Sequence, residues 1–539
     1  MVVGYGPVGQ VLSLLLARRG WRVVVAEQQP RAYPMPRAVT FDGHAARILA
    51  AAGAADVIQA IGEPTADFVV ENGAGQTLLR FALRRAGRHG WPDSTSMYQP
   101  GLEAALEACG TGQPTLRVQR GQRAVGLAQR GPLVEVVTQD TSSGRSGRLC
   151  ARWVVGCDGA NSVVRAHLNT TVTDFGFSAD WMACDVTPAR PSDFPPSNLQ
   201  VADPLGPRVA VSAGGSHRRW EFMRLPGEPA AEFGTLASAW RHLAAFGVTP
   251  ANATLDRHAV YTVRACCADR WRSGRVLIAG DAAHQMPPFG GQGLCSGFRD
   301  AANLAWKLDL ALRDGQDETL LDTYERERRA NVIQVIRLSV WLGNLICMVD
   351  PDAAARRDAS MLRSADGGGE GGGGAAEIPD SLADGLVCRE RAGARAPFAG
   401  SLLPHARVSY EGTTGWFDDV VGPGFVLLSP EDPAALLDRH LRDFLLGLGT
   451  KLIQVAPADG SPACSGSPAD GGDRRRGLLL DVEQVYLPWL DSMRAIGALV
   501  RPDFYLFGIG RDRAGVAAMT AGLRNSLDLA ASITERKPT

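Results

Sequence analysis

The stretch of residues 275–308, RVLIAGDAAHQMPPFGGQGLCSGFRDAANLAWKL, decides the fold of this chain of 539 residues. Its apolar start, residues 275–279, is typical of a buried strand. Residues 280–293 contain a Gly-Asp step, two adjacent prolines and a Gly-Gly-Gln-Gly run, which predict a tightly shaped loop. Apolar side chains at helical spacing then predict a helix over residues 297–308. A glycine-rich loop that leads into a helix offers unpaired backbone N–H groups, so the stretch predicts a site for an anion or an electron-rich ring edge.

A second glycine motif stands at the start of the chain, where residues 2–9 read VVGYGPVG with the spacing G-x-G-x-x-G. A helical pattern and an apolar strand over residues 22–26 follow, and the strand ends at Glu27. This order is the full dinucleotide-binding fingerprint: the glycines permit a tight turn against a pyrophosphate, and the acidic side chain accepts hydrogen bonds from ribose hydroxyls. Only residues 1–3 precede the first glycine, so we expect either a short first strand or a misassigned start.

Two further regions complete the nucleotide-binding domain and interrupt it. Residues 153–165, with a Cys157-Asp158-Gly159 step, repeat the order of strand, glycine-containing turn and helix. From residue 175 to about residue 264 the chain alternates and is rich in aromatics, which predicts a largely antiparallel inserted sheet. The predicted boundaries are 1–170 and 265–350 for the two parts of the nucleotide-binding domain, 171–264 for the sheet, 351–379 for a flexible glycine-rich linker and 380–530 for a third domain.

Composition argues against several classes of protein. The net charge of −1 does not favour a nucleic-acid partner, and 45% hydrophobic with 21% charged residues is ordinary for a globular protein. The ten cysteines include no C-x-x-C pair, so a zinc site or a redox dithiol is not expected. The most apolar stretch, residues 335–349, contains Arg337 and is too short to span a membrane, so it predicts a buried helix. No signal peptide is expected, and these features together favour a cytoplasmic protein without a membrane or metal partner.

The three glycine motifs, in this order, resemble those of the single-component FAD-dependent aromatic hydroxylases, the class A flavoprotein monooxygenases. The resemblance narrows to the 3-(3-hydroxyphenyl)propionate/3-hydroxycinnamate hydroxylase group and extends to Gly90-Trp91-Pro92, Trp220-Glu221-Phe222-Met223 and Arg501-Pro502-Asp503. It implies an α/β fold with a Rossmann-type FAD-binding domain of the p-hydroxybenzoate hydroxylase type and an inserted antiparallel substrate-binding sheet. It also implies a C-terminal thioredoxin-like domain without redox cysteines, with a structural role or a role in subunit contacts such as those of a homodimer.

The resemblance implies FAD as the cofactor and NAD(P)H as a co-substrate. Among the residues that the resemblance assigns to FAD, Glu27 would contact the adenosine ribose and Asp281 the ribityl chain. The backbone N–H groups of Leu294 and Cys295 would contact the flavin edge. Many relatives have Asn where Cys295 stands, a departure that affects only side-chain contacts. The residues expected to bind FAD are Gly4, Gly6, Pro7, Val8, Gly9, Glu27, Gln28, Arg37, Gln99, Asp158, Gly280, Asp281, Pro288, Gly291, Gln292, Gly293, Leu294 and Cys295.

The resemblance also implies a reaction. NAD(P)H would reduce FAD, O₂ would add at the flavin C4a, and the hydroperoxide would hydroxylate a phenolic acid such as 3-(3-hydroxyphenyl)propionate ortho to its hydroxyl, giving a catechol. A deprotonated phenol is the more reactive form, so a base should contact the hydroxyl group. The candidate catalytic residues are His284, Tyr261 and Pro288, and the candidate substrate residues are Arg208, Trp220 and Phe222, with Arg219 and Arg224 as further partners for a carboxylate.

Other functions remain open at this point. A polyketide or other secondary-metabolite hydroxylase and a Baeyer–Villiger enzyme would use the same chemistry on bulkier substrates. A non-catalytic FAD-binding protein would lack substrate-stimulated NAD(P)H oxidation. A flavin-dependent halogenase is excluded, because no lysine precedes Lys307 and no Trp-x-Trp motif occurs. A simple NAD(H) dehydrogenase would lack the loop at residues 280–293.

Overall fold

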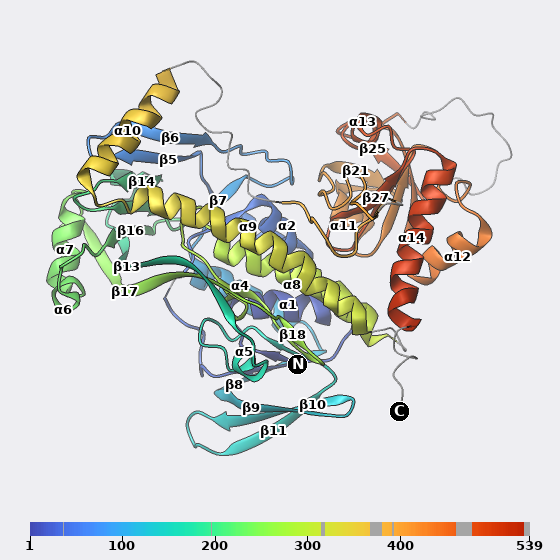
Figure 1. Ribbon diagram of the computed structural model, residues 1–539, viewed down its shortest axis with the longest axis horizontal. Helices are drawn as coiled ribbons and strands as arrows, with labels where there is room; N and C mark the ends of the chain where they lie inside the picture. Colours follow the sequence, from blue (N-terminus) through green and yellow to red (C-terminus); the bar gives the residue numbers. More distant parts are fainter. Residues whose placement is uncertain are drawn as a thin grey trace. The chain divides into compact units, whose positions relative to one another are not determined.

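The computed structural model describes residues 1–35, 37–195, 197–313, 318–366, 380–390, 393–459 and 477–532. The chain divides into two compact units (Figure 1). The first comprises Met1–Gly87, Trp91–Ala301 and Val332–Ile378, and the second comprises Arg88–Gly90, Ala302–Asn331 and Pro379–Thr539. Each unit has its own sheets and its own buried apolar clusters.

A six-stranded sheet in the order β18-β19-β12-β1-β2-β8 forms the nucleotide-binding part of the first unit. Strand β1 covers only Val2–Val3, a short first strand, and pairs in parallel with β2 and β12. Parallel strands end at the same edge of a sheet, so the loops after β1, β12 and β19 lie close together. The other elements are β2 (Val23–Glu27), β8 (Leu116–Arg120), β12 (Val154–Gly156), β18 (Arg272–Ser273), β19 (Val276–Ile278), α1 (Pro7–Ala17), α4 (Gln99–Thr111), α5 (Val163–His167) and α8 (Gln292–Leu312).

An eight-stranded sheet in the order β20-β17-β13-β16-β15-β14-β5-β6 contains the predicted inserted sheet. Its pairings are antiparallel except that of β14 with β5. Strands β5 and β6 precede residue 171, so the predicted boundaries 171–264 were too narrow. Pairing of β5 with β14 joins distant segments, which local periodicity does not reveal. The strands are β5 (Asp67–Asn72), β6 (Thr77–Ala82), β13 (Val172–Pro188), β14 (Asn198–Ala202), β15 (Arg208–Ser212), β16 (Arg218–Met223), β17 (Ala253–Ala268) and β20 (His284–Gln285).

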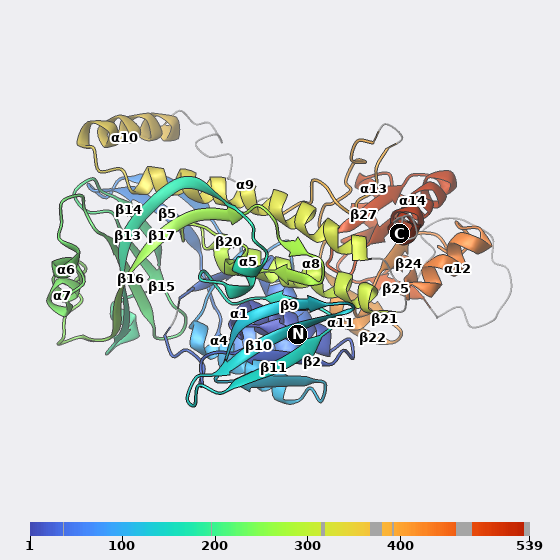
Figure 2. The same ribbon diagram turned by 60° about the horizontal axis from the view of Figure 1, so that its bottom comes forward.

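Helices α6 (Ala230–Phe233) and α7 (Leu236–Ala244) cover one face of this sheet (Figure 2). Side chains alternate along a strand, so Met182 and Cys184 of β13 lie on this covered face. Trp181, Ala183 and Asp185 therefore lie on the opposite face, which is the face that concerns the site.

The smaller elements of the first unit are two three-stranded sheets and short helices. They are β9 (Gln122–Arg130), β10 (Leu133–Asp140), β11 (Ser146–Ala151), β3 (Thr40–Asp42), β4 (Glu63–Pro64), β7 (Ser94–Ser96), α2 (Gly43–Leu49), η1 (Ala50–Ala54), α3 (Ala55–Ile61), η2 (Pro191–Asp193) and η3 (Gly280–Ala282).

Helix α10 (Pro351–Asp366) corrects the predicted linker, which began at residue 351. Its sequence, PDAAARRDASMLRSAD, starts with Pro and is rich in strong helix formers, and these outweigh the neighbouring glycine run. Arg357 anchors the helix by donating to the backbone oxygens of Leu345 at 2.8 Å and Ala202 at 2.7 Å. Residues 367–379 of the predicted linker lie outside the described residues.

The predicted apolar helix at residues 335–349 is the second half of α9 (Asp322–Ile346), which follows η4 (Glu318–Leu321). Within the described part of the chain, no single helix combines the length and apolar character needed to cross a membrane. Thr319–Ile346 and Pro351–Arg363 reach that threshold only when counted together, across a bend of 111°.

The second unit contains a seven-stranded mixed sheet in the order β22-β21-β25-β24-β23-β26-β27. Leu427 and Leu499 of this sheet share an apolar cluster with Trp306 and Leu310 of α8, so the unit includes helical segments from well before residue 380. Its elements are β21 (Arg407–Tyr410), β22 (Thr413–Trp416), β23 (Val426–Ser429), β24 (Lys451–Pro457), β25 (Leu478–Asp481), β26 (Gly497–Val500), β27 (Leu506–Gly510), α11 (Phe417–Val421), α12 (Arg439–Gly447), α13 (Tyr486–Ser492) and α14 (Arg513–Ser532).

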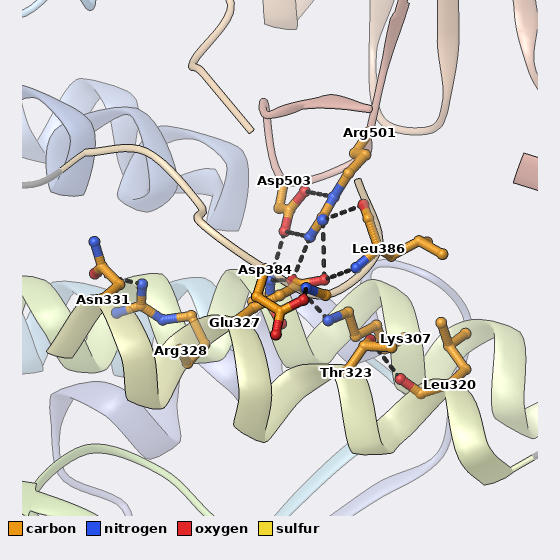
Figure 3. Close-up of polar contacts among 12 residues, drawn as sticks. Lys307, Leu320, Thr323, Glu327, Arg328, Asn331, Asp384, Leu386, Arg501 and Asp503 are labelled. Atoms are coloured by element: carbon orange, nitrogen blue, oxygen red, sulfur yellow. Dashed lines mark hydrogen bonds and ion pairs between the residues drawn. The ribbon is translucent and has the colours of Figure 1, made fainter. Parts of the chain in front are cut away.

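A buried cluster of charged side chains lies in the second unit (Figure 3). Lys307 Nζ lies 2.8 Å and Arg501 Nη2 lies 2.7 Å from Glu327 Oε2, and Arg501 Nη2 also lies 2.7 Å from Asp503 Oδ2. Burial alone would raise the pKa of Glu327, but Arg501 and Lys307 lower it to about 2. Burial lowers the pKa of Lys307 to about 8, against the attraction of Glu327. With the lysine charged, the two cations and two anions balance.

Candidate active site

The glycine motif at residues 4–9 and the Cys157-Asp158-Gly159 turn lie against each other at the edge of the nucleotide-binding sheet. Gly4 has φ of +95°, and a Cβ there would lie 2.4 Å from the backbone oxygen of Cys157 and 2.9 Å from Cα of Asp158. A Cβ on Gly9 would lie 2.2 Å from the backbone oxygen of Gly4. Only glycine fits at these two positions, because backbone atoms cannot move aside as a flexible side chain can.

The glycine loop at residues 280–293 joins these two motifs through Val8. A Cβ on Gly280 would lie 3.1 Å from Val8 Cγ2, and a Cβ on Gly297 would lie 2.5 Å from the same atom. The loop at residues 280–293 and the first turns of α8 thus pack on the first turn of α1. The structure brings together the three motifs that the sequence predicts to act as one site.

Gly6 differs from its neighbours, and this difference fits a bound phosphate. A Cβ there would have a single described neighbour within 4 Å, Arg37 Nη2 at 3.8 Å. Gly6 is also the N-cap residue of α1, with Pro7 at the first helical position and, among the described residues, no side chain capping the helix. Open space in front of an uncapped helix N-terminus is what a pyrophosphate requires.

Glu27 ends β2 beside this turn. Its Oε2 accepts a hydrogen bond from the N–H of Tyr5 at 2.6 Å, and its Oε1 accepts one from the N–H of Gln29 at 2.7 Å. Each carboxylate oxygen has a further lone pair, so the arrangement fits a ribose diol as well. Gln28, the next predicted ligand, is exposed.

Gln99 holds the loop that carries Arg37. Its Oε1 accepts hydrogen bonds from the N–H groups of Arg37 at 2.9 Å and Ala38 at 2.6 Å, and its Nε2 donates to Glu103 Oε1 at 2.6 Å. Arg219 Nη1 donates to the backbone oxygen of Arg37 at 2.6 Å. The backbone at Arg37 is therefore held from both sides, by the buried Gln99 and by Arg219, while the Arg37 side chain is exposed.

The side chain of Asp158 forms hydrogen bonds within its own turn. Its Oδ1 accepts a hydrogen bond from Ser162 Oγ at 2.6 Å, and its Oδ2 accepts one from the N–H of Val164 at 3.1 Å, at the start of α5. Burial raises the pKa of this carboxyl group, which the bond from Ser162 opposes. The predicted contact of Asp158 with the pyrophosphate path rests on its backbone next to Gly4.

His284, a predicted candidate base, is buried and its imidazole contacts other side chains of the protein. Its Nε2 lies 2.7 Å from Asp300 Oδ2, and the same oxygen accepts a hydrogen bond from the N–H of Gly280 at 3.1 Å. The imidazole also lies against Trp271, with ring centroids 5.4 Å apart. Through these contacts His284 and Asp300 hold the loop that bears Asp281, which fits a loop-stabilising role of His284 better than the role of a base.

Helix α8 begins at Gln292, five residues before its predicted start at residue 297. Asp281 and Pro288 are exposed, Gly290 and Gly291 have φ of +90° and +67°, and Gly293 and Leu294 are half-buried. The N–H groups of Leu294 and Cys295 thus lie in a first helical turn, where such groups lack helical partners. Cys295 is a free, buried thiol, and burial raises its pKa.

Two residues near this helix start, Arg299 and Asp300, were not predicted from the sequence. Arg299 donates to Gln292 Oε1 at 3.1 Å and to Asp42 Oδ2 at 2.5 Å, so it ties the glycine loop to the start of α2. Asp300 holds His284 as described above. The signal was present in the sequence, because adjacent charges in an otherwise apolar helix indicate buried partners.

The face of the eight-stranded sheet opposite α6 and α7 meets the glycine loop through aromatic contacts. Phe289 of the loop packs edge-on against Trp181 of β13, with centroids 5.6 Å apart, and against Phe177 at 6.0 Å. In the strand register, Trp181 lies between Tyr261 of β17 and Met223 of β16. Tyr261 is thus on the face that adjoins the loop.

The predicted substrate residues have other partners. Trp220 and Phe222 lie on the face covered by α7, and Phe222 stacks on His242 with centroids 4.9 Å apart. Arg208 Nη1 donates to Asp203 Oδ2 at 2.8 Å. Alternation places Trp220 and Phe222 away from the loop, a relation that a list of aromatic residues does not reveal.

Among the described residues, no group of His, Cys, Asp and Glu side chains could hold a metal ion.

The chain matches the sequence family described as FAD binding domain over residues 1–339, and the family described as HcaD C-terminal domain over residues 400–525. It is 34% identical over its whole length to a probable NADH-specific resorcinol 4-hydroxylase of Rhodococcus jostii (strain RHA1), of which it covers 96%. It is 29% identical, over 94% of its length, to a 3-(3-hydroxy-phenyl)propionate/3-hydroxycinnamic acid hydroxylase of Comamonas testosteroni, of which it covers 93%. The flavin-dependent monooxygenase PieE, solved with FAD and substrate, has the same fold, with a TM-score of 0.76 over 98% of both chains at 22% identity.

The converging glycine loops and the family match define an FAD-binding protein. More narrowly, the chain belongs to the FAD-dependent aromatic hydroxylases, the class A flavoprotein monooxygenases, which use NAD(P)H and O₂ as co-substrates.

Proposed function

We propose that this hydroxylase acts on a small phenol that carries a second substituent meta to its hydroxyl group, with NADH as the electron donor. The full-length match to the NADH-specific resorcinol 4-hydroxylase carries this proposal. Resorcinol, 3-(3-hydroxyphenyl)propionate and 3-hydroxycinnamate all share the meta arrangement. The reaction balances as ArH + O₂ + NADH + H⁺ → ArOH + NAD⁺ + H₂O.

Charge pairing favours a neutral phenol such as resorcinol over a phenolic acid. The arginines predicted to bind a substrate carboxylate each contact a protein carboxylate, with Arg208 on Asp203, Arg219 on Asp185 and Arg224 on Asp180. A substrate carboxylate would have to compete with these pairs. The phenolic acid remains the second candidate, because several relatives about 30% identical are named as 3-(3-hydroxy-phenyl)propionate/3-hydroxycinnamic acid hydroxylases.

FAD, when bound, supplies the redox chemistry that links NADH and O₂ to the ring. The first helical turn of α1 and Arg37 would hold its pyrophosphate, Glu27 its ribose, and Asp281 its ribityl chain. Pro288 and the N–H groups of Leu294 and Cys295 would face the flavin ring. The buried pair of His284 and Asp300 holds the glycine loop at residues 280–293 in its conformation. The aromatic contacts of Phe289 exclude water from the inner side of this loop.

We further propose that residues 380–530 adopt a thioredoxin-like arrangement without redox chemistry. Four of the strands run in the order β24-β23-β26-β27, and β26 is antiparallel to both of its neighbours. Helices α12 and α14 pack on this sheet. Cys388 is a free thiol, and burial raises its pKa, which disfavours the reactive thiolate.

Purified protein tests the proposal directly. A flavin absorption spectrum, NADH oxidation that resorcinol stimulates, and a hydroxylated product labelled from isotopic O₂ are the expected results. Parallel assays with 3-(3-hydroxyphenyl)propionate decide between the two candidates. Protein that cannot be loaded with FAD, or that oxidises NADH without forming product from any phenol, would contradict the proposal. Oxygen inserted into a carbon–carbon bond would favour the Baeyer–Villiger alternative.

A further inference from the structure

A buried carboxylate lies behind Tyr261 on the face of the eight-stranded sheet opposite α6 and α7. Glu221 of β16 is 6% exposed, and its Oε2 accepts a hydrogen bond from Tyr261 Oη at 2.9 Å. Tyr261 itself is half-buried. The pair of Tyr261 and Glu221 thus lies on the face that meets the glycine loop through Trp181 and Phe289.

The charged groups that face Glu221 keep the pair in a defined state. Arg219 Nη1 lies 3.5 Å from Glu221 Oε1, and the Arg219 Nη2 atom lies 2.7 Å from Asp185 Oδ1. Arg257 Nη1 lies 3.6 Å from the other oxygen of Asp185. Two guanidinium groups therefore balance two carboxylates, and one added proton on Glu221 changes the local charge by one.

The titration of these groups suits proton transfer. Burial raises the pKa of Glu221, and Arg219 and the bond from Tyr261 oppose this only in part. Burial and the neighbouring Glu221 raise the pKa of Tyr261 well above 10.0. Tyr261 thus remains protonated and donates to Glu221, while its own lone pairs remain available to accept a hydrogen bond.

Arg219 connects this pair to the cofactor side of the site. It donates from Nη1 to the backbone oxygen of Arg37 at 2.6 Å and from Nε to Asp185 Oδ1 at 2.7 Å. The loop that Gln99 holds by two N–H groups is thereby fixed by Arg219 through its carbonyl as well.

We propose that Glu221 is the final acceptor of the proton of the substrate hydroxyl, that Tyr261 relays this proton, and that Arg219 positions Glu221 relative to the Arg37 loop. The inference rests on the proposed function, since it requires a phenolic substrate. The substrate O–H bond breaks as its proton moves to Tyr261 Oη, and the Tyr261 proton moves to Glu221 Oε2. Glu221 becomes a neutral carboxylic acid and the substrate becomes a phenolate, so that the negative charge moves to the ring that is to be hydroxylated. After turnover the proton returns to water.

The test compares Glu221→Gln and Tyr261→Phe with a matched surface variant, Glu135→Gln, which removes a strand carboxylate paired with the exposed Arg148. Glu135→Gln is expected to keep FAD and the wild-type rate of NADH oxidation, and the FAD content of all three variants is measured before their hydroxylation rates are compared. Hydroxylation should fall about 100-fold or more in Glu221→Gln and Tyr261→Phe and stay unchanged in Glu135→Gln, because general-base assistance contributes about 10²–10⁴-fold.

The pH profile and substrate acidity give readouts that a structural role would not move. In the wild type, kcat should fall on the acid side with an apparent pKa above 4.5, the ordinary value for Glu. In Glu221→Gln this limb should disappear, and a fluorinated resorcinol, which ionises more easily, should restore part of the rate. The absorbance of bound resorcinol should titrate at a higher pH in Glu221→Gln than in the wild type.

Two outcomes separate the inference from the proposed function. Wild-type turnover of phenols, together with Glu221→Gln and Tyr261→Phe variants of normal rate and pH profile, would overturn the relay and leave the function intact. A wild-type protein that hydroxylates no phenol would overturn both. If Glu221→Gln does not fold, Tyr261→Phe alone decides, since Tyr261 is half-buried and the substitution keeps the ring.

Discussion

At the scale of single residues, the glycines of one motif have different physical roles. Gly9 is required by the protein itself, because a Cβ there would overlap the backbone oxygen of Gly4 at 2.2 Å. Gly6 has open space and an ordinary backbone conformation, with φ of −70°. The G-x-G-x-x-G pattern predicted both glycines equally, since spacing alone does not show which neighbours a Cβ would meet.

These roles predict opposite results for two alanine variants. Gly9→Ala should lower the thermal stability of the protein even without FAD, because backbone atoms must shift. Gly6→Ala should leave apoprotein stability within about 0.5 kcal/mol and weaken FAD binding at least tenfold, because its methyl group occupies the approach of the phosphate. Thermal unfolding of apoprotein and fluorescence titration with FAD measure the two effects. Equal FAD affinity for Gly6→Ala and wild type would show that the pyrophosphate binds elsewhere.

Asp300 gives a second residue-scale prediction. Asp300→Asn should lower the free energy of unfolding by about 1.5–3 kcal/mol, the value of hydrogen bonds to a charged group, because both His284 and Gly280 lose a carboxylate acceptor. FAD affinity should fall with it. Asp309→Asn, further along α8 and paired with the exposed Arg313, is the control. If His284→Asn kept FAD binding and stability yet lost hydroxylation, the result would favour His284 as a base over its loop-stabilising role.

At the scale of elements, strand alternation decides which side chains reach the site. Trp220 and Glu221 are neighbours in sequence, but Trp220 packs under α7 and Glu221 faces the opposite side. Trp220→Ala should therefore lower the free energy of unfolding by about 3–5 kcal/mol, as loss of a large core side chain does. The folded fraction should keep the Michaelis constant for phenol unchanged. A changed Michaelis constant in folded Trp220→Ala protein would mean that β16 presents its other face to substrate.

The sequence predicted strongly patterned elements well and long-range pairings poorly. The apolar run at residues 276–278 and the glycine loop after it could be recognised, because their signals are local. Strands β5 and β6 were assigned to another domain, because only their pairing with the distant β14 places them in the sheet. Likewise the role of Arg299 depends on Asp42, which lies 257 residues away in the chain.

At the scale of the whole molecule, the units do not follow the predicted domain boundaries. Ala302–Asn331 was predicted as part of the nucleotide-binding domain and lies within the FAD-binding family match over residues 1–339, yet it packs in the second compact unit. Trp306, Leu310 and Leu320 bury their side chains in that unit's core, and Glu327 joins its charged cluster (Figure 3). The glycine-rich run near residue 370 suggested a boundary there, because composition marks where a chain can bend but not where its helices pack.

The charged cluster of this unit allows its stability to be tested by charge balance. Glu327 accepts hydrogen bonds from Lys307, from Asn303, from the N–H of Leu386 and twice from Arg501. Glu327→Gln should lower the free energy of unfolding by about 3–5 kcal/mol, because two buried cations then share Asp503 alone. Adding Lys307→Met should recover part of this loss, since Arg501 and Asp503 then form a neutral pair. Urea unfolding at constant salt measures both variants.

The pH dependence of the same variants distinguishes charge from shape. The pKa of Glu327 lies at about 2, below its ordinary 4.5, so its contribution to stability is complete above 4.5 and is lost as the pH falls towards 2. The difference in stability between wild type and Glu327→Gln should therefore shrink over that range. The control Arg313→Met removes the exposed cation of the pair with Asp309 and should change stability by less than about 1 kcal/mol. If the double variant loses the full sum of the two single losses, and the gap does not shrink in acid, then packing rather than charge balance holds this cluster together.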